Sequence, residues 1–422
     1  MEYESSLPKN KVKRVYSYST AWTSQFYFCS LPLRLDSYKS CNFGCKYCFV
    51  SHRGGSFRKD CLATADIVAF GKCLNDSCKP TTEDTGLIPE CIKHRLPIHF
   101  GGMSEPFRHG ELDDKITYML LSILAETGYP TVVSTKSRLP AIEPYFTLLR
   151  SMKYVAIQFS FSTLDDDIAS KIEPYAPLPS SRLRAMHKLS QAGLWVGCRL
   201  QPFIPNISGS ISALVEKLAG VGVRHITVEH LKLGLYERRK ILTELQQHKG
   251  KASIDNYNLS KLKLKGTEYE LLSKYKFDTL KSFREETKKH NVTLGIGDND
   301  FHDLGDSPNC CGVGKLPGFE NYFRRQITYA IWKRRKDGLI NYSLIGNEWA
   351  PKHSIRRYIN SRCRNKGSPN PPCYTSDDYL RREWNNPNGL HSPTECANVV
   401  LAGFQDDAGN LVYRYEPIYK FE

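Results

Sequence analysis

The segment Ser40-Cys-Asn-Phe-Gly-Cys-Lys-Tyr-Cys-Phe49 carries three cysteines, Cys41, Cys45 and Cys48, with the spacing C-x3-C-x2-C. Three thiolates on one short loop can hold three irons of a [4Fe-4S] cube and leave the fourth iron open. The alternative interpretations are a zinc site that lacks its fourth ligand, or three buried thiols. Because the sequence that follows the loop also fits, as described below, a cluster-binding loop is the favoured interpretation.

An open iron can be chelated by the amino and carboxylate groups of S-adenosylmethionine (SAM), and a reduced cluster then releases a 5′-deoxyadenosyl radical from it. The spacing, with the aromatic Tyr47 just before the last cysteine, resembles the cluster loop of the radical SAM superfamily. The resemblance implies an enzyme with a [4Fe-4S] cluster and SAM as cofactors. It also implies a low-potential electron donor such as flavodoxin or ferredoxin as a partner.

Short apolar runs alternate with helical stretches after this loop, a pattern typical of parallel β/α units. Six such runs predict a partial (β/α)6 barrel, followed by a C-terminal α+β domain that is basic and contains cysteines. Active groups are then expected at the carboxyl ends of the strands. The predicted strands are Ser30–Leu35, Leu96–Phe100, Thr131–Thr135, Val155–Ser160, Leu194–Leu200 and His225–Val228.

Residues at these strand ends form a candidate SAM site. The glycines at 101 and 102 allow a close approach of the backbone to a ligand. Ser104 and Glu105 are acceptors for the SAM amino group, and Lys136 suits its carboxylate. The remaining candidates are Ser160 and Ser162 for the ribose, Tyr47 for the adenine and Arg199 as a second charged contact. A turn at Gly101-Gly102 and a surface lysine at 136 are the simpler interpretations.

Within the superfamily, residues 30–235 look most like the spore photoproduct lyase-like branch. The segments on which this resemblance rests are Gly101-Gly-Met-Ser-Glu-Pro106, Ser134-Thr-Lys-Ser137, Ile172-Glu-Pro-Tyr-Ala-Pro177, Arg182-Leu183, Gln191-Ala-Gly193 and Pro202-Phe-Ile-Pro205. The resemblance implies that Ser104 and Lys136 touch SAM and that Glu105 replaces an aspartate. The lyase itself uses a cysteine just before that serine as a hydrogen donor. This chain has Gly102 and Met103 there, so repair of spore photoproduct is not expected.

The net charge of +15 is concentrated near the C-terminus. Residues 321–366 hold twelve Lys or Arg and only two acidic residues, interleaved with aromatic side chains. Lys and Arg side chains interleaved with aromatics suit the binding of a nucleic acid. The alternative interpretation is a solvated helix face with its aromatic side chains packed inward. The candidate nucleic-acid contacts are Arg324, Arg325, Lys333, Arg334, Arg335, Arg356 and Arg357.

A second group of cysteines follows the predicted barrel. Cys311, Cys363, Cys373 and Cys396 can supply an auxiliary Fe–S cluster or a zinc site, with Cys310 able to replace Cys311. No C-x2-C pair occurs among them, so free thiols in a packed domain remain the alternative. The cysteines at 61, 73, 78 and 91 are expected to be structural.

The predicted organisation has four parts. These are an N-terminal extension (1–29), the partial barrel (30–235), a helical closing segment (236–300) and the C-terminal basic domain (301–422). The N-terminus is polar and no apolar run is long enough for a membrane span, so a cytoplasmic enzyme without membrane partners is expected.

Three functions are compatible with these features. The leading one is hydrogen abstraction from a nucleic acid or nucleotide by a radical SAM lyase or transferase. The second is a radical SAM enzyme that modifies a peptide or protein. The third, of another class, is an iron–sulfur protein that binds nucleic acid without SAM chemistry.

Overall fold

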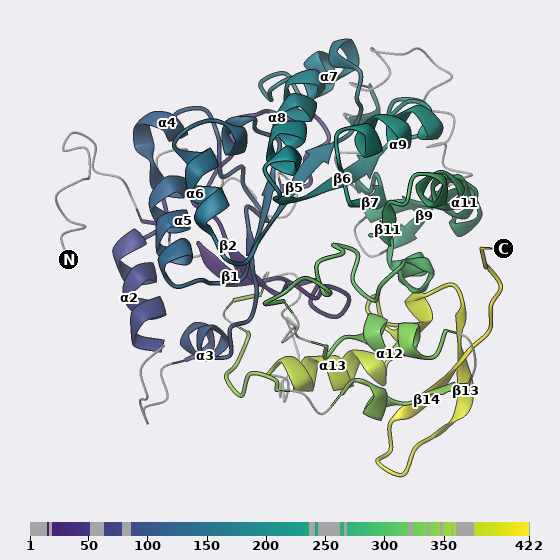
Figure 1. Ribbon diagram of the computed structural model, residues 1–422. Coiled ribbons are helices and arrows are strands. Elements are labelled where there is room, and N and C mark those ends of the chain that lie inside the picture. The colour runs from purple at the N-terminus through teal and green to yellow at the C-terminus, as the bar shows by residue number, and fades with distance from the viewer. Residues whose placement is uncertain are drawn as a thin grey trace.

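A mixed α/β structure built around one large sheet forms the molecule (Figure 1). The computed structural model describes residues 15–16, 19–50, 63–77, 86–235, 241–243, 262–265, 268–319, 324–335, 338–346, 349–356, 358–359 and 375–421. In these residues the sheet has eight strands in the order β1-β2-β3-β4-β5-β6-β7-β11.

Seven strands of this sheet run parallel. Strands β2 to β7 follow the order of the chain, as successive right-handed β/α units do. They are β2 (Leu33–Leu35), β3 (Ile98–Phe100), β4 (Thr131–Thr135), β5 (Val155–Phe161), β6 (Trp195–Phe203) and β7 (His225–His230). These are the six strands predicted from the apolar runs, and the prediction of each is confirmed.

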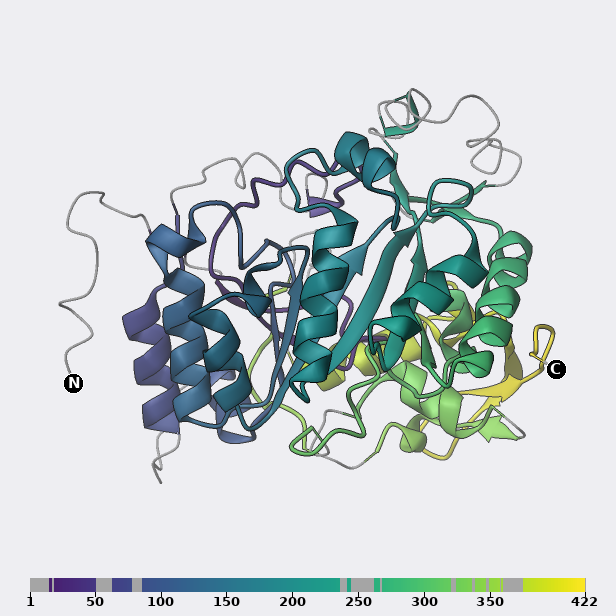
Figure 2. The same ribbon diagram turned by 45° about the horizontal axis from the view of Figure 1, so that its top comes forward.

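Both faces of the parallel strands are covered, which explains the short apolar runs in their sequences. All five residues of β4 are buried. The connecting helices turn an apolar stripe towards the sheet, as in α8, where Leu183, Met186 and Leu189 are buried. Figure 2 shows α5, α6, α8, α9 and α11 along the outer side of the sheet. The helices are α2 (Ile67–Ser77), α3 (Leu87–Lys93), α4 (Glu111–Asp114), α5 (Ile116–Glu126), α6 (Tyr145–Ser151), α7 (Asp166–Ile172), α8 (Pro179–Gln191), α9 (Ile211–Gly220) and α11 (Ser273–Lys289).

The N-terminal part of the chain belongs to the core. Strand β1 (Thr20–Trp22) pairs antiparallel with β2, and the Trp22, Phe26 and Tyr27 side chains are buried. The backbone N–H of Ile327 donates to the carbonyl of Tyr27, which ties this segment to the C-terminal region. Residues 19–29 of the predicted N-terminal extension are therefore part of the sheet and its core.

The segment 236–300 is not wholly helical, contrary to expectation. Strand β11 (Thr293–Ile296) follows α11 and pairs parallel with β7, so the sheet gains a seventh parallel strand. A small sheet in the order β8-β10-β9 also lies here, formed by β8 (Leu233–Gly234), β9 (Leu262–Lys265) and β10 (Glu268–Leu271). The strands β9 and β10 are four residues long each, too short for their alternation to stand out from the charged sequence around them.

The C-terminal region packs against the sheet on the side away from α7 and α8 (Figure 1). It contains α12 (Ile327–Lys333), α13 (Ser376–Trp384), and a sheet of β12 (Leu339–Ile340), β14 (Leu411–Tyr415) and β13 (Val399–Gln405). The sequence of residues 397–419 predicts a β-hairpin around Asp406-Asp-Ala-Gly-Asn410, and the structure confirms it as β13–β14. Its buried Tyr413 joins the same apolar core as the main sheet. Among the described residues, no helix is both long and apolar enough to cross a membrane.

Candidate active site

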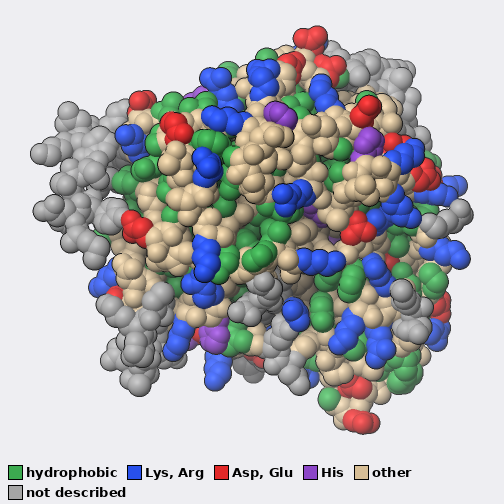
Figure 3. All heavy atoms as spheres, in the orientation of Figure 1, with side chains coloured by type: hydrophobic (Ala, Val, Ile, Leu, Met, Phe, Trp, Pro, Cys, Tyr) green, Lys and Arg blue, Asp and Glu red, His purple; other side chains and the backbone are tan. Residues whose placement is uncertain are grey.

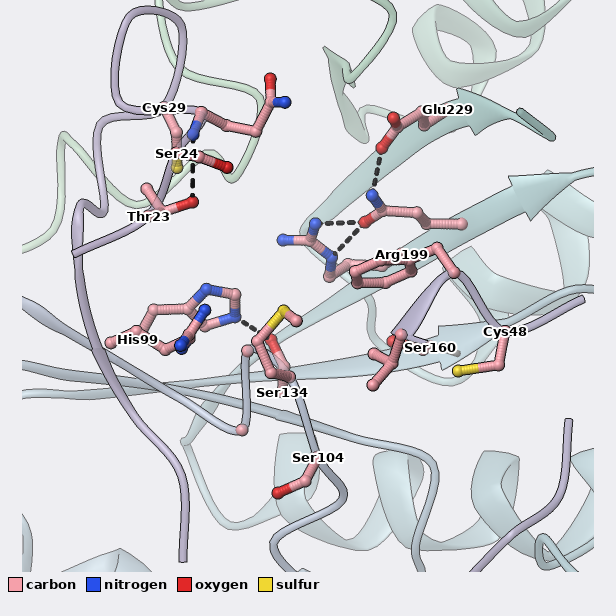
Figure 4. A pocket seen from close by; sticks show the side chains of 18 of the residues that line it. Thr23, Ser24, Cys29, Cys48, His99, Ser104, Ser134, Ser160, Arg199 and Glu229 are labelled. Atoms are coloured by element: carbon pink, nitrogen blue, oxygen red, sulfur yellow. Dashed lines mark hydrogen bonds between the residues drawn. The ribbon is translucent and has the colours of Figure 1, made fainter. Parts of the chain in front are cut away.

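A cavity of about 1040 Å³ opens at the carboxyl ends of the parallel strands. Its walls come from the cysteine loop (residues 41–48), the loop after β3, the ends of β4 to β7, and the segments 21–29 and 297–310. Figure 4 shows Cys48 and Cys29 on opposite sides of this space, with Arg199 and Ser160 between them, Glu229 towards the top and Ser104 towards the bottom. Polar groups from separate segments therefore converge on one space, as expected for the active face of parallel β/α units.

The cysteine loop is held in place by neighbouring backbone groups. The N–H of Lys46 donates to the Ile172 carbonyl, and the N–H of Tyr175 donates to the Phe43 carbonyl. Gly44 has φ +64°, and a Cβ there would lie 3.0 Å from Tyr175 Cδ2. A glycine is thus required both for the turn and for the contact.

The three loop thiols line the cavity together and influence one another electrostatically. Burial among protein atoms, then the Glu105 charge, raises the pKa of the Cys41 thiol to about 12, although solvent reaches it. Burial and the Glu173 charge also raise the pKa of Cys45. A bound metal must supply the positive charge that stabilises such thiolates.

The three thiols suit the iron–sulfur cluster that the sequence predicts. In the described part of the chain no group of three His, Cys, Asp or Glu is placed to hold a single ion. Ligands of a [4Fe-4S] cube each bind a different iron, so their sulfurs need not converge on one point. Cys41, Cys45 and Cys48 therefore fit a cluster with one open iron.

The loop after β3 is shaped by contacts within the protein. A Cβ at Gly101, where φ is +85°, would lie 2.6 Å from the Ser134 carbonyl, and one at Gly102 would lie 2.7 Å from Arg34 Cδ. Both glycines line the cavity, but the structure explains them first by packing. The sequence analysis explained the two glycines by a close approach of the backbone to a ligand and did not anticipate these packing contacts.

Ser104 and Glu105 also line the cavity, and their side chains already make internal hydrogen bonds. Ser104 Oγ donates to the Tyr38 carbonyl at 2.6 Å. Glu105 accepts from the N–H groups of Phe107 (3.0 Å) and Lys136 (2.8 Å). Burial raises the pKa of Glu105, which these donors partly oppose. The carboxylate thus orders the strand-end loops, and its remaining acceptor capacity faces the cavity.

Glu173 is a buried hub that the sequence reasoning quoted in a motif but did not assign to the site. It accepts from Lys136 Nζ (3.0 Å), Ser162 Oγ (2.7 Å), the Tyr47 hydroxyl and the Arg182 guanidinium. Burial alone would raise its pKa, but the Arg182 and Lys136 charges hold the pKa well below its ordinary value. Its position after Ile172, at the end of α7, was the only sequence signal.

This hub changes the predicted roles of three residues. Tyr47 is only 6% exposed and its hydroxyl is bonded to Glu173, so its ring edge rather than its hydroxyl is available to a ligand. Lys136, expected to bind the SAM carboxylate, is an ion-pair partner of Glu173. Ser162 is fully buried and is not part of the cavity wall, so the cavity gives no support to its predicted ribose contact.

The wall formed by β6 and β7 is a connected polar network. Arg199 Nε donates to Gln201 Oε1 at 3.0 Å, and Gln201 donates onward to Glu229. Glu229 Oε1 is 2.8 Å from Lys232 Nζ. Arg199 and Ser160 line the cavity as predicted, whereas Gln201, Glu229 and Lys232 were missed because they are ordinary polar residues in the sequence.

The predicted auxiliary metal site is not formed by its described members. Cys311 packs in a small apolar cluster with Val132 and Ala156. Cys396 is buried elsewhere, with Sγ 3.3 Å from Asp303 Oδ1. Cys363 and Cys373 lie outside the described residues, as do Cys61 and Cys78. Cys310 instead lines the main cavity, together with Cys29.

The predicted nucleic-acid contacts separate into two kinds. Arg324, Lys333 and Arg334 are exposed. Arg325 instead pairs with Asp377, Arg335 donates to the Gly305 carbonyl at 2.8 Å, and both serve the fold. Arg356 is partly buried and Arg357 lies outside the described residues. In Figure 3, Lys and Arg side chains lie over the C-terminal elements at the lower right and also over the rest of this face, so they form no single patch in this view.

Comparisons with known proteins give partial matches. No protein-family model matches the chain. An uncharacterized protein of Acidianus two-tailed virus is 31% identical over 120 residues, 25% of this chain and 40% of that protein. An uncharacterized protein of Mycobacterium tuberculosis is 22% identical over 218 residues, 48% of this chain and 60% of that protein. The chain thus matches 40–60% of the length of these relatives.

Solved structures that resemble this chain do so with TM-scores below 0.5. A cysteine-to-serine mutant of spore photoproduct lyase gives a TM-score of 0.45 at 15% identity, covering 62% of this chain and 74% of that chain. Streptococcus suis SuiB bound to S-adenosylmethionine gives 0.33 at 17% identity, covering 52% and 48%. Spore photoproduct lyase, the branch indicated by the sequence motifs, is therefore among the solved structures to which this chain is similar.

Proposed function

We propose that this chain is a radical SAM enzyme with a partial (β/α)6 barrel extended by β11. One observation carries the proposal: the three motif cysteines and eight of the nine predicted SAM contacts line a single cavity, although they come from five separate segments. Chance would not bring a C-x3-C-x2-C loop and polar strand ends to the same space. A structural or redox-sensing cluster would not need that convergence.

The bound cofactors would supply a 5′-deoxyadenosyl radical by one-electron cleavage of SAM at the [4Fe-4S] cluster. The cysteine loop would hold three irons, and the cavity wall from residue 101 to 105, with Ser160, would seat SAM. Glu173 would keep Lys136 and the Tyr47 ring in position beside the cysteine loop. Segments 21–29 and 297–310 cover the cavity from the other side, where they would limit access of water to the radical.

The proposed substrate is a nucleic acid or nucleotide, because exposed cations lie on the same C-terminal region whose Tyr358 and Ile359 reach the cavity wall. A reductant such as flavodoxin or ferredoxin would supply the electron, in a cytoplasmic setting. A peptide substrate is the second proposal, and an Fe–S nucleic-acid-binding protein without SAM cleavage is the third. Identification of the reaction product would show whether the enzyme is a lyase or a transferase.

Release of 5′-deoxyadenosine tests this function. The anaerobically reconstituted chain, reduced with dithionite, is expected to release it from SAM, and more in the presence of DNA or RNA. Release that nucleic acid does not change would favour the peptide substrate. A verified, reducible cluster that releases none would reject the radical enzyme in favour of the binding protein.

Cys45→Ala is expected to abolish both the charge-transfer absorbance of the cluster and the release of 5′-deoxyadenosine, because one iron loses its thiolate. Cys73→Ala, in α2 and absent from the cavity wall, is the matched control and should retain both. Continued SAM cleavage by the Cys45→Ala chain would contradict the cysteine-loop assignment.

A further inference from the structure

The inner side of the sheet is polar where the cavity reaches it. Arg34, His99, Ser134, Gln158 and Arg199 come from the five adjacent strands β2 to β6, and all but Gln158 line the cavity. Branched apolar side chains usually fill the interior of parallel β/α barrels. A polar layer beside a large cavity therefore indicates a polar ligand at this depth.

Arg199 stands out in this layer because its charge lacks a carboxylate. Its hydrogen-bond acceptors are amide oxygens, Gln201 Oε1 at 3.0 Å from Nε and Gln158 Oε1 at 3.3 Å from Nη1. Within the described part of the chain it makes no ion pair, whereas three other cations of the cavity wall, Arg34, Lys136 and Lys232, pair with Asp36, Glu173 and Glu229. A half-buried guanidinium without a counter-charge is costly, so an anion in the cavity would stabilise it.

The groups around Arg199 also favour the binding of an anion. His99 bonds to Ser134 Oγ at 2.8 Å, and burial together with the Arg199 and Arg34 charges lowers its pKa to about 3. His99 is therefore neutral and can donate from one ring nitrogen. The nearest carboxylate of the network, Glu229, is already bonded to Gln201 and Lys232.

The position of Arg199 separates it from the cysteine loop. Its charge acts on the thiols of Cys29 and Cys310, whereas the charge of Lys136 acts on Cys45. SAM must lie against the cysteine loop to reach the open iron. Arg199 is thus placed towards the opposite wall, where a second molecule would lie.

We propose that Arg199, with His99 in the same cavity wall, binds a phosphate group of a nucleotide substrate. This inference rests on the proposed function for the place of SAM, and it reassigns Arg199 from the cofactor to the substrate. Phosphate is favoured over a carboxylate because Tyr358, which follows Arg356 in the basic stretch, lines the same cavity and offers a stacking surface for a base.

Equilibrium binding to the reconstituted chain, saturated with SAM, tests the assignment. The probes are inorganic phosphate, a four-nucleotide single-stranded DNA and N-acetylglutamate as a source of carboxylate. We expect phosphate and the DNA to bind, Arg199→Gln to weaken both at least tenfold, and Arg199→Lys to weaken them less. Arg184→Gln, at an exposed position on α8, removes the same charge outside the cavity and should have little effect.

Several results would overturn the inference. These are an equal loss of affinity in Arg184→Gln, unchanged phosphate affinity in Arg199→Gln, or binding of N-acetylglutamate alone. A tenfold loss of SAM affinity with phosphate binding intact would return Arg199 to the cofactor. Release of 5′-deoxyadenosine, measured on the same preparation, reports the proposed function separately: specific phosphate binding without release would keep the anion site and reject the radical chemistry.

Discussion

At the residue scale, Glu173 organises the wall between the cysteine loop and the strand ends. Its carboxylate neutralises the Arg182 guanidinium, which is 1% exposed, and also pairs with Lys136. When one partner of a buried ion pair is removed, the other is left as an uncompensated charge. The stability of the site and the placement of Lys136 and Tyr47 thus depend on one side chain.

Glu173→Gln is therefore expected to lower the free energy of unfolding by about 3–5 kcal/mol, since it keeps the shape but removes the charge. Chemical denaturation of the full chain measures this. Glu286→Gln, which breaks the exposed pair with Lys289 on α11, should change the stability little and serves as the control. Equal stability of the Glu173→Gln chain and the unsubstituted chain would show that the hub is not a structural centre.

The pH dependence of this difference has a defined sign. The folded pKa of Glu173 is depressed below its ordinary value of 4.5, so its contribution is present above that value and is lost as the pH falls through the lower folded pKa. The stability gap between the unsubstituted chain and Glu173→Gln should be constant near neutral pH and shrink below about pH 4.5. A gap that persists or widens in acid would contradict the ion-pair interpretation.

At the scale of the elements, the cysteine loop depends on its contacts with the chain after α7. Gly44 has φ +64°, and its Cα faces the Tyr175 ring. Gly44→Ala should cost about 1–2 kcal/mol of backbone strain and also displace the loop from Tyr175. We expect fewer irons per chain after reconstitution, measured by iron and sulfide analysis.

Gly128→Ala isolates the effect of the contact, because Gly128 has a similar φ of +55° but no atom within 4 Å of the added Cβ. It should lose similar stability and retain full iron content. If both variants assemble the cluster equally well, the packing against Tyr175 does not position the cysteine loop.

At the scale of the whole molecule, some of the Lys and Arg side chains of the basic region are bonded within the fold, whereas others are exposed. Replacing the exposed Arg324, Lys333 and Arg334 together by Ala should weaken nucleic-acid binding and reduce the slope of log K against log salt by about 2 to 3 units, if each contacts a phosphate. Fluorescence anisotropy over a salt series measures both. The matched triple variant of the exposed Lys171, Lys217 and Lys288, on the outer helices, should leave the slope nearly unchanged. Equal slopes for both variants would make the charge a general property of the surface.

Local patterns in the sequence were sufficient to predict β2 to β7, the β13–β14 hairpin and the cysteine loop. Apolar runs report burial on both faces, and a thiol spacing reports a shared ligand, so neither needs the fold to be known. The strands β9 and β10 and the addition of β11 to the sheet were missed because elements of four residues carry little periodic signal. The ion pair of Lys136 was not anticipated because Glu173, its partner, is 37 residues away in the chain.

The sequence by itself therefore determined the parallel β/α class, the cysteine loop and several of the residues that line the cavity. Only the tertiary structure decided which of them are already engaged: Ser162 and Lys136 with Glu173, Glu105 with backbone donors, Arg325 and Arg335 with the fold. The physical reason is that burial and pairing depend on segments that are distant in the chain, whereas spacing and periodicity are local. Arg199 became the candidate anion contact for the same reason, since its lack of a carboxylate partner is visible only in three dimensions.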